Sequence, residues 1–220
     1  MALETIELET GDDPTASVIV LHGLGADGND YVTLAHELDL TPIGAVRFVF
    51  PHAPARPVTI NGGYVMRAWY DILSLEGERR EDVQGLRESR SEVDALIAVE
   101  RSRGVAASRI VLAGFSQGGA MTLLAGLRYP ERLAGLVGLS GYLPLADTTA
   151  DERSDANTGA PIFLVHGRMD PVIPFARALA SRDALLALGY AVEWHDYPMQ
   201  HSVCAEEVAD LERFLLGVLR

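Results

Sequence analysis

The sequence predicts an α/β protein, with a mostly parallel central sheet flanked by helices on both faces. Two observations lead to this fold class: short apolar runs recur along the 220 residues, and helix-length amphipathic segments lie between them. The runs are nearly continuous in Val, Ile and Leu, which is typical of strands that are covered on both faces. Alternation of such strands with helices indicates a parallel sheet.

Each element follows from its own pattern. Strands are expected over 17–21, 46–50, 65–70, 110–115, 133–139, 161–166 and 191–197. Helices are expected over 80–103 and 204–219, where apolar residues recur every three or four positions. The proline-rich segment 51–63 ends in a hairpin-turn sequence, Asn61-Gly62-Gly63. The segment 146–159, rich in Asp, Thr and Ala, is expected to be an exposed loop.

Size and charge limit the classes of function. A chain of 220 residues is expected to form one domain over 1–220 that buries about 70% of its surface. The 18 basic and 31 acidic residues give 18 − 31 = −13, which disfavours nucleic acid and anionic membranes as partners. All 18 basic residues are Arg, so Schiff-base lysines and the P-loop lysine are excluded.

The single cysteine and the lack of long apolar runs bear on location. Cys204 has no partner for an intramolecular disulfide, which favours a reducing compartment. Residues 1–13 are acidic and polar, unlike a signal peptide, and no run reaches the roughly 18 apolar residues of a membrane span. We therefore expect a cytoplasmic protein without integral membrane association, and the sequence leaves a monomer and a homodimer both open.

The main chemical motif is Gly114-Phe115-Ser116-Gln117-Gly118. A G-x-S-x-G string is weak by itself, but this one follows the expected strand 110–115 and precedes a helix that begins near Gly119. Strand, sharp turn and helix together are the setting of a nucleophile elbow. The alternative is a glycine-rich turn that Ser116 merely caps. We predict that Ser116 is a nucleophile.

A nucleophilic serine needs a base and an acid, which follow it in the order Ser, acid, His in this kind of fold. His195 lies inside the expected strand 191–197, whereas His201 lies in the loop that follows, so we favour His201 as the base. Asp170 lies just after the strand 161–166, and we favour it as the acid over an alternative role as a helix N-cap. Asp147, Asp151 and Asp155, in the segment 146–159, are expected to be solvated.

An oxyanion hole needs two N–H donors. The backbone N–H of Gln117 lies at the start of the helix after Ser116, and the Gly-rich turn Gly23-Leu24-Gly25 follows the first expected strand. Leu24 and Gln117 are therefore the expected donors. His22 is expected to brace this turn. No His, Cys or Asp cluster has the spacing of metal ligands, so we expect no metal.

The chain also resembles a known family along most of its length, from about residue 18 to 216. The resemblance rests on seven ordered motifs: Leu21-His22-Gly23-Leu24-Gly25, Pro51-His52-Ala53-Pro54 with Arg56-Pro57-Val58-Thr59, Trp69-Tyr70-Asp71-Ile72, Gly114 to Ala120, Leu139-Ser140-Gly141-Tyr142-Leu143-Pro144, His166-Gly167 with Asp170-Pro171, and Met199 with His201-Ser202. In these motifs the chain resembles the carboxylesterase and acyl-protein thioesterase family of α/β-hydrolases, also called phospholipase/carboxylesterase.

The resemblance implies an α/β-hydrolase fold and a Ser116–Asp170–His201 triad with Leu24 and Gln117 as oxyanion donors. It further implies an acyl groove and a reaction that needs no cofactor. The residues assigned to this substrate-binding groove are Ile72, Leu73, Leu75, Tyr142 and Val172.

The expected function is that of a serine carboxylesterase acting on short to medium acyl esters through an acyl-enzyme. An acyl-protein thioesterase or lysophospholipase is the alternative, and a non-catalytic binding protein of the same fold is a third reading. The apolar patch 72–75 ends in the charges of Glu76 and Glu78. Since each buried CH₂ contributes about 0.8 kcal/mol only along an apolar wall, we expect a preference for small, neutral acyl groups of about four to eight carbons.

Overall fold

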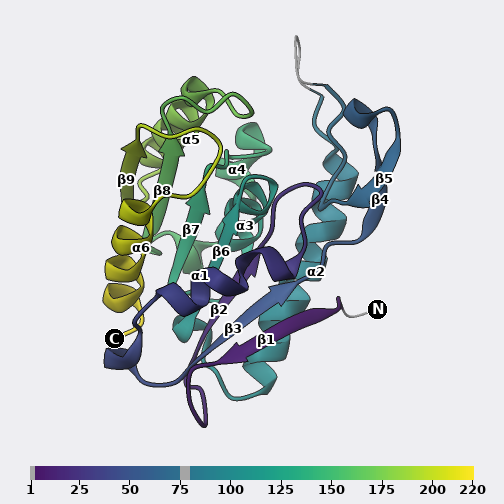
Figure 1. Ribbon diagram of the computed structural model, residues 1–220. Helices are drawn as coiled ribbons and strands as arrows, with labels where there is room; N and C mark the ends of the chain where they lie inside the picture. The colour runs from purple at the N-terminus through teal and green to yellow at the C-terminus, as the bar shows by residue number, and fades with distance from the viewer. Residues whose placement is uncertain (1–2, 75–79) are drawn as a thin grey trace.

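The computed structural model describes residues 3–74 and 80–220, and its main element is a seven-stranded sheet (Figure 1). The strands of this sheet, in spatial order, are β1 (Thr5–Glu9), β3 (Val46–Pro51), β2 (Ala16–Leu21), β6 (Ile110–Phe115), β7 (Gly135–Leu139), β8 (Ile162–Gly167) and β9 (Val192–Tyr197). Only β1 pairs antiparallel, with β3, and all other neighbours are parallel. The prediction of a mostly parallel sheet is confirmed.

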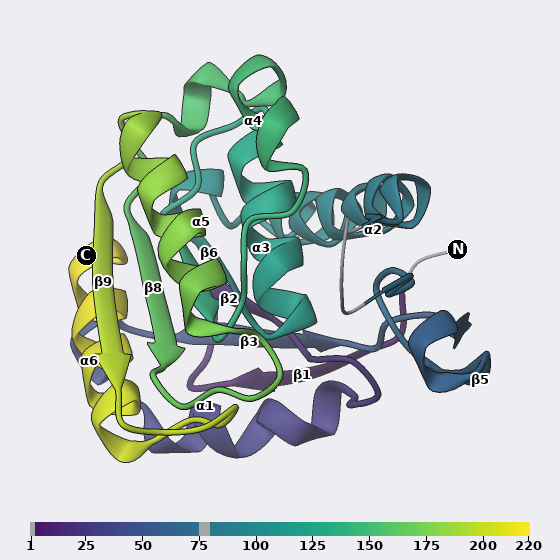
Figure 2. The same ribbon diagram turned by 90° about the horizontal axis from the view of Figure 1, so that it is seen from above.

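Helices cover both faces of the sheet (Figure 2). Their bounds are α1 (Val32–Glu37), α2 (Val83–Ser102), α3 (Gln117–Arg128), α4 (Ala146–Glu152), α5 (Phe175–Ala187) and α6 (Ala205–Val218). One core cluster joins α2, α3 and α5 to one face, through side chains such as Leu86, Met121 and Leu185. The other joins α1 and α6 to the opposite face, through Ala35 and Phe214. No helix among the described residues is both long and apolar enough to cross a membrane.

The prediction that 65–70 is a buried strand of the main sheet is wrong. The chain there forms β5 (Tyr64–Arg67), which pairs antiparallel with β4 (Ala55–Val58) in a separate two-stranded sheet. Tyr64 is 70% exposed and Val65 is 59% exposed, so this strand is not covered on both faces. The predicted turn at Gly62 and Gly63 is confirmed, since both glycines have positive φ and join the two strands.

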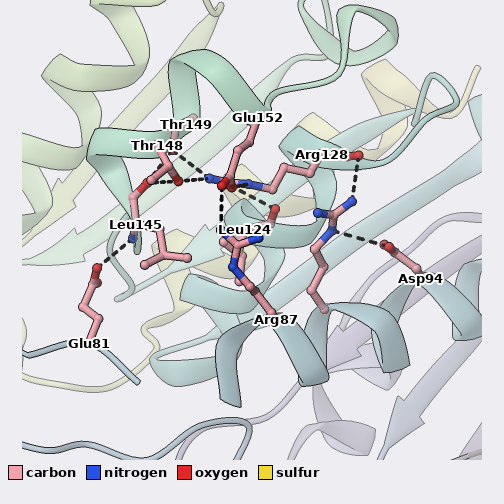
Figure 3. Close-up of polar contacts among 10 residues, drawn as sticks. Glu81, Arg87, Asp94, Leu124, Arg128, Leu145, Thr148, Thr149 and Glu152 are labelled. Atoms are coloured by element: carbon pink, nitrogen blue, oxygen red, sulfur yellow. Dashed lines mark hydrogen bonds and ion pairs between the residues drawn. The ribbon is translucent and has the colours of Figure 1, made fainter. Parts of the chain in front are cut away.

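The prediction that the segment 146–159 is an exposed loop is also wrong. The segment contains α4 and a short 3-10 helix, Asp155–Asn157, and both Thr149 and Asn157 are fully buried. The buried Arg128 holds α4 against α3: its guanidinium donates to Glu152 at 2.8 Å and to the hydroxyls of Thr148 and Thr149 (Figure 3). The buried polar residues of this segment belong to an internal network, whereas its aspartates, Asp147, Asp151 and Asp155, are exposed, as the sequence predicts.

Helix predictions from periodicity are confirmed with small shifts of their ends. The segment 80–103 forms α2 and 204–219 forms α6. On α2, Leu86 and Val93 are buried as expected, but Val83 is 44% exposed because it is the first residue of the helix. The edge strand β1, with its alternation of Ile and Leu with Glu, carries a period-two pattern that the sequence reading did not use.

Candidate active site

Ser116 occupies a sharp turn between β6 and α3, at the carboxyl edge of the sheet. Its backbone has φ 56° and ψ −116°, a strained conformation for a residue other than glycine. The turn needs glycine on both sides: a Cβ on Gly118 would lie 2.0 Å from the Leu21 carbonyl oxygen, and one on Gly114 would lie 2.4 Å from the Gly118 backbone. The glycines of the motif therefore allow the strand and helix to approach closely around Ser116.

Two hydrogen bonds connect Ser116, His201 and Asp170. The Ser116 Oγ lies 2.9 Å from His201 Nε2, and His201 Nδ1 lies 2.6 Å from Asp170 Oδ2. An ionised carboxylate can only accept, so Nδ1 carries the proton and Nε2 presents its lone pair to the serine hydroxyl. The three residues come from the loops after β6, β9 and β8, and their side chains meet as the sequence predicts.

Asp170 is fixed by more contacts than the sequence indicated. Its Oδ1 accepts hydrogen bonds from the N–H groups of Val172 at 2.8 Å and Ile173 at 2.9 Å, which closes a turn before α5. Its Oδ2 also lies 3.3 Å from Nε2 of the buried His166, and that nitrogen bonds to the Ile173 carbonyl oxygen at 2.8 Å. Burial lowers the pKa of His166, so a neutral ring flanks the carboxylate.

The histidines that compete with His201 have structural contacts. His195 Nε2 lies 2.9 Å from a Glu193 oxygen and its Nδ1 lies 3.1 Å from Asp210, on the face of β9. His22 accepts from the Ala53 N–H at 3.0 Å through Nε2 and contacts the Gly23 carbonyl oxygen through Nδ1 at 2.7 Å. Burial lowers the pKa of His22. The expectation that His22 braces the glycine-rich turn is confirmed.

The expected oxyanion donors lie beside Ser116. The N–H of Gln117 belongs to the first turn of α3, where helical N–H groups have no intrahelical acceptor. The Gln117 side chain accepts from the Trp69 N–H at 2.8 Å and donates to the Tyr70 carbonyl oxygen at 2.7 Å. Leu24 lines the same cavity as Ser116 and Gln117, and its turn is held by a hydrogen bond from the Gly25 N–H to the Arg67 carbonyl oxygen at 2.9 Å.

A cavity of about 320 Å³ opens beside Ser116, and we call it the Ser116 cavity. Its lining residues are Leu24, Ile60, Tyr70, Ile72, Ser74, Ser116, Gln117, Tyr142, Pro171, Val172, Ile173 and Arg177. Of the expected groove residues, Ile72, Tyr142 and Val172 are in this set. Leu73 lines an adjoining, smaller pocket of about 30 Å³, and Leu75 lies outside the described residues.

Sequence reasoning missed part of this lining. Tyr70 belongs to a motif that was used only for the resemblance, and its hydroxyl lies 2.6 Å from that of Tyr142. Arg177 carried no signal of its own, although the turn that Asp170 begins continues directly into α5, where Arg177 lies in the first turn. Arg177 could have been predicted as a cavity residue from its place in the sequence, seven residues after Asp170 and in the first turn of the helix that follows.

The arrangement supports nucleophilic chemistry at a carbonyl. A serine hydroxyl that faces an imidazole lone pair, with backbone N–H groups nearby, can attack an acyl group and stabilise the resulting oxyanion. Among the residues that the structure describes, no group of three or more His, Cys, Asp and Glu side chains is placed to hold a metal ion.

Comparisons with known proteins agree with this arrangement. A family model described as phospholipase/carboxylesterase matches residues 3–219. The acyl-protein thioesterase 1 of Gibberella zeae is 41% identical over 210 residues, covering 91% of this chain and 89% of that protein. The protein of the same name from Yarrowia lipolytica is 41% identical over 206 residues, covering 91% of each.

Solved structures give the same result. The crystal structure of Arabidopsis thaliana SOBER1 has a TM-score of 0.88 at 29% identity and covers 93% of this chain and 99% of that one. The crystal structure of Zea mays acyl-protein thioesterase 2 has a TM-score of 0.86 at 28% identity and covers 99% of each chain. The chain therefore belongs to the phospholipase/carboxylesterase family of α/β-hydrolases, and it is a serine-type hydrolase.

Proposed function

We propose that this chain is a carboxylesterase for short to medium acyl esters, with Ser116 as nucleophile, His201 as general base and Asp170 as the acid of the triad. The observation that carries the proposal is the pair of hydrogen bonds from Ser116 through His201 to Asp170. Asp170 keeps the imidazole in the tautomer that accepts from serine and stabilises the imidazolium during the reaction.

The proposed reaction runs through an acyl-enzyme. His201 Nε2 takes the hydroxyl proton as Ser116 Oγ attacks the ester carbonyl, and the backbone N–H groups of Leu24 and Gln117 stabilise the oxyanion. The tetrahedral intermediate collapses as the imidazolium protonates the leaving alcohol. A water molecule then gives a proton to the same imidazole and attacks the acyl-enzyme. As the Ser116 Oγ–acyl bond breaks and the acid leaves, the imidazolium returns this proton to Ser116 Oγ. These steps require no cofactor.

The preference for short acyl chains is supported by the size of the Ser116 cavity. Its volume of about 320 Å³ is at the lower end of the roughly 300–1,000 Å³ that small-molecule pockets span. Ile72, Val172 and Ile173 provide apolar wall, where each buried CH₂ is worth about 0.8 kcal/mol. The charged positions Glu76 and Glu78, on which the length argument also rested, lie outside the described residues.

A second candidate function is that of an acyl-protein thioesterase, or of a lysophospholipase with the same chemistry. The names of the relatives from Gibberella zeae and Yarrowia lipolytica favour the thioesterase. A panel of a p-nitrophenyl ester, an acyl-CoA, a lysolipid and an S-acylated peptide separates these activities. The proposal predicts the highest kcat/KM for the simple ester, and a higher value for the acylated peptide would replace it.

The catalytic assignment is tested at Ser116. Ser116→Ala should lower kcat on a simple ester by about 10⁴-fold or more while thermal unfolding stays cooperative. The matched control is Ser91→Ala on the exposed surface of α2, which should keep wild-type turnover. A fluorophosphonate probe should label the wild type and the control but not Ser116→Ala. Labelling of a different serine would refute the assignment.

Four further expectations belong to the same proposal. We propose a single domain over 1–220, a location in the cytoplasm as the lone Cys204 suggests, a small ester or thioester as substrate, and no nucleic-acid partner. Limited proteolysis tests the first and a fluorescent fusion tests the second. A monomer and a homodimer remain alternatives, and light scattering on the purified protein distinguishes them.

A further inference from the structure

Arg177 places a positive charge on the wall of the Ser116 cavity. It lies in the first turn of α5, and it is the one charged residue among those that line the cavity in the described part of the chain. The rest of the lining is apolar or uncharged. A chain with a formal charge of −13 thus presents a cation next to its candidate nucleophile.

The guanidinium is held in place by an aromatic ring. The Arg177 Cζ lies over the Tyr142 ring, 3.2 Å from its centroid, and the Tyr142 hydroxyl is hydrogen-bonded to that of Tyr70. The ring attracts the cation through its π electrons and takes no hydrogen bond of the usual N–H···O kind from the guanidinium. The cation is therefore oriented before any substrate arrives.

The same guanidinium lacks a hydrogen-bonded acceptor within residues 3–74 and 80–220. The nearest carboxylate, Glu81, has its Oε1 3.9 Å from Arg177 Nη2, which is beyond hydrogen-bond length. The other Glu81 oxygen accepts from the Leu145 N–H at 3.0 Å, and Figure 3 shows Glu81 turned toward Leu145. Glu81 and Arg177 therefore form a long ion pair, and no hydrogen bond joins the two side chains.

We propose that Arg177 recognises a carboxylate at the far end of the acyl chain, so that the preferred substrates are half-esters of dicarboxylic acids. The proposal rests on the proposed esterase function and names its substrate class. A planar guanidinium donates two parallel hydrogen bonds to a carboxylate, and the apolar side chains of Ile72, Val172 and Ile173 cover the methylenes between. The sequence led us to expect neutral acyl groups, because it did not place Arg177 in the cavity.

The test compares esters that differ in one charge. The ethyl half-esters of succinate, adipate and suberate are paired with ethyl butyrate, hexanoate and octanoate, and the readout is the ratio of the two kcat/KM values at each chain length. At the chain length where the wild type has its highest ratio, we expect that ratio to fall roughly tenfold in Arg177→Met, which corresponds to the loss of one charge-assisted hydrogen bond. The ratio for Arg177→Lys should lie between the ratios of wild type and Arg177→Met. A ratio that Arg177→Met leaves unchanged would overturn the proposal.

A matched control lies on the same helix. Arg182 lies over the Trp194 ring and beside Asp183, outside the Ser116 cavity, so Arg182→Met should leave the ratio unchanged. An equal fall in Arg182→Met would assign the effect to overall charge and overturn the proposal. Cooperative thermal unfolding of each variant shows that the comparison is between folded proteins.

Two further arms separate the other readings. In 4-(hexanoyloxy)butanoate the carboxylate is on the alcohol, and a preference for this ester that Arg177→Met abolishes would place the alcohol in the cavity and overturn the acyl assignment. Calorimetric binding of adipate and hexanoate tests Arg177 without turnover: wild type should bind adipate more tightly, and Arg177→Met should not. Failure of the wild type to hydrolyse ethyl hexanoate would reject the esterase function, whereas equal affinity for the two acids would reject the role of Arg177.

Discussion

The buried carboxyl group of Glu207 should make the stability of the fold decrease as the pH rises. Glu207 lies in the first turn of α6, it is 0% exposed, and neither of its carboxyl oxygens accepts a well-aligned hydrogen bond from the described residues. Burial disfavours the ionised form more than the nearby Cys204 N–H favours it, and so raises the pKa of Glu207 from 4.5 to about 8. Glu207→Gln keeps the shape of the side chain and removes the ionisation.

The direction and size of the effect follow from the two pKa values. Below pH 4.5 the carboxyl group is protonated in both the folded and the unfolded chain, so the full stability is present. Between 4.5 and about 8 the unfolded chain releases its proton and the folded chain does not, so stability is lost as the pH rises through this window. The slope is about 1.4 kcal/mol per pH unit inside this window and smaller near its two ends, so the wild type should lose about 3.5 kcal/mol relative to Glu207→Gln between pH 5 and pH 8.

Urea unfolding between pH 5 and pH 8 measures this difference directly, as the change in the free energy of unfolding of each protein. The control is Glu206→Gln, at an exposed position in the same turn of α6, which should follow the wild type at every pH. If the curves of wild type and Glu207→Gln run parallel over the whole range, Glu207 is ionised in the folded protein and the reasoning is refuted.

Three other predictions test the site. His201→Ala should lower kcat at least a thousandfold and His195→Ala should not, and the opposite result would show that the wrong histidine was chosen. Gly118→Ala should abolish cooperative thermal unfolding, because its Cβ would lie 2.0 Å from the Leu21 carbonyl oxygen; a stable, active variant would contradict the need for glycine there. A p-nitrophenyl ester series from acetate to palmitate should give a kcat/KM that peaks at about four to eight acyl carbons, and a rise that continues at twelve or more would favour the lipid thioesterase.

The positions of Ser116, Asp170 and His201 could be predicted from the sequence, because each depends on a pattern within one short segment. The strand–turn–helix around Ser116 is contiguous, and its glycines are required by the close approach of the backbone. The positions of Asp170 and His201 follow from one rule, that the carboxyl ends of parallel strands meet at one edge of the sheet. The alternation of apolar runs and amphipathic segments was sufficient for the sheet and the longer helices.

Contacts between distant segments could not be predicted in this way. His166 lies within a strand, and nothing in the sequence indicates that its ring reaches the same carboxylate oxygen as His201. Arg177 is an ordinary helical residue until the fold brings it over Tyr142. The error at 146–159 has the same origin. Thr149 is buried where Arg128 of α3 donates to its hydroxyl, and Asn157 is buried where its side chain bonds to the Leu133 N–H and the Tyr129 carbonyl oxygen.

The side chain of Gln117 connects the Trp69–Tyr70 segment of the cavity wall to the turn that carries Ser116. Its amide bridges the Trp69 N–H and the Tyr70 carbonyl oxygen, while its own backbone N–H lies beside Ser116. Any shift of the Tyr70 segment is therefore transmitted to the backbone N–H of Gln117, which we propose as an oxyanion donor. A substrate that fits the cavity poorly would displace this amide as well, so the shape of the acyl group should govern the rate of the chemical step and not the strength of binding alone.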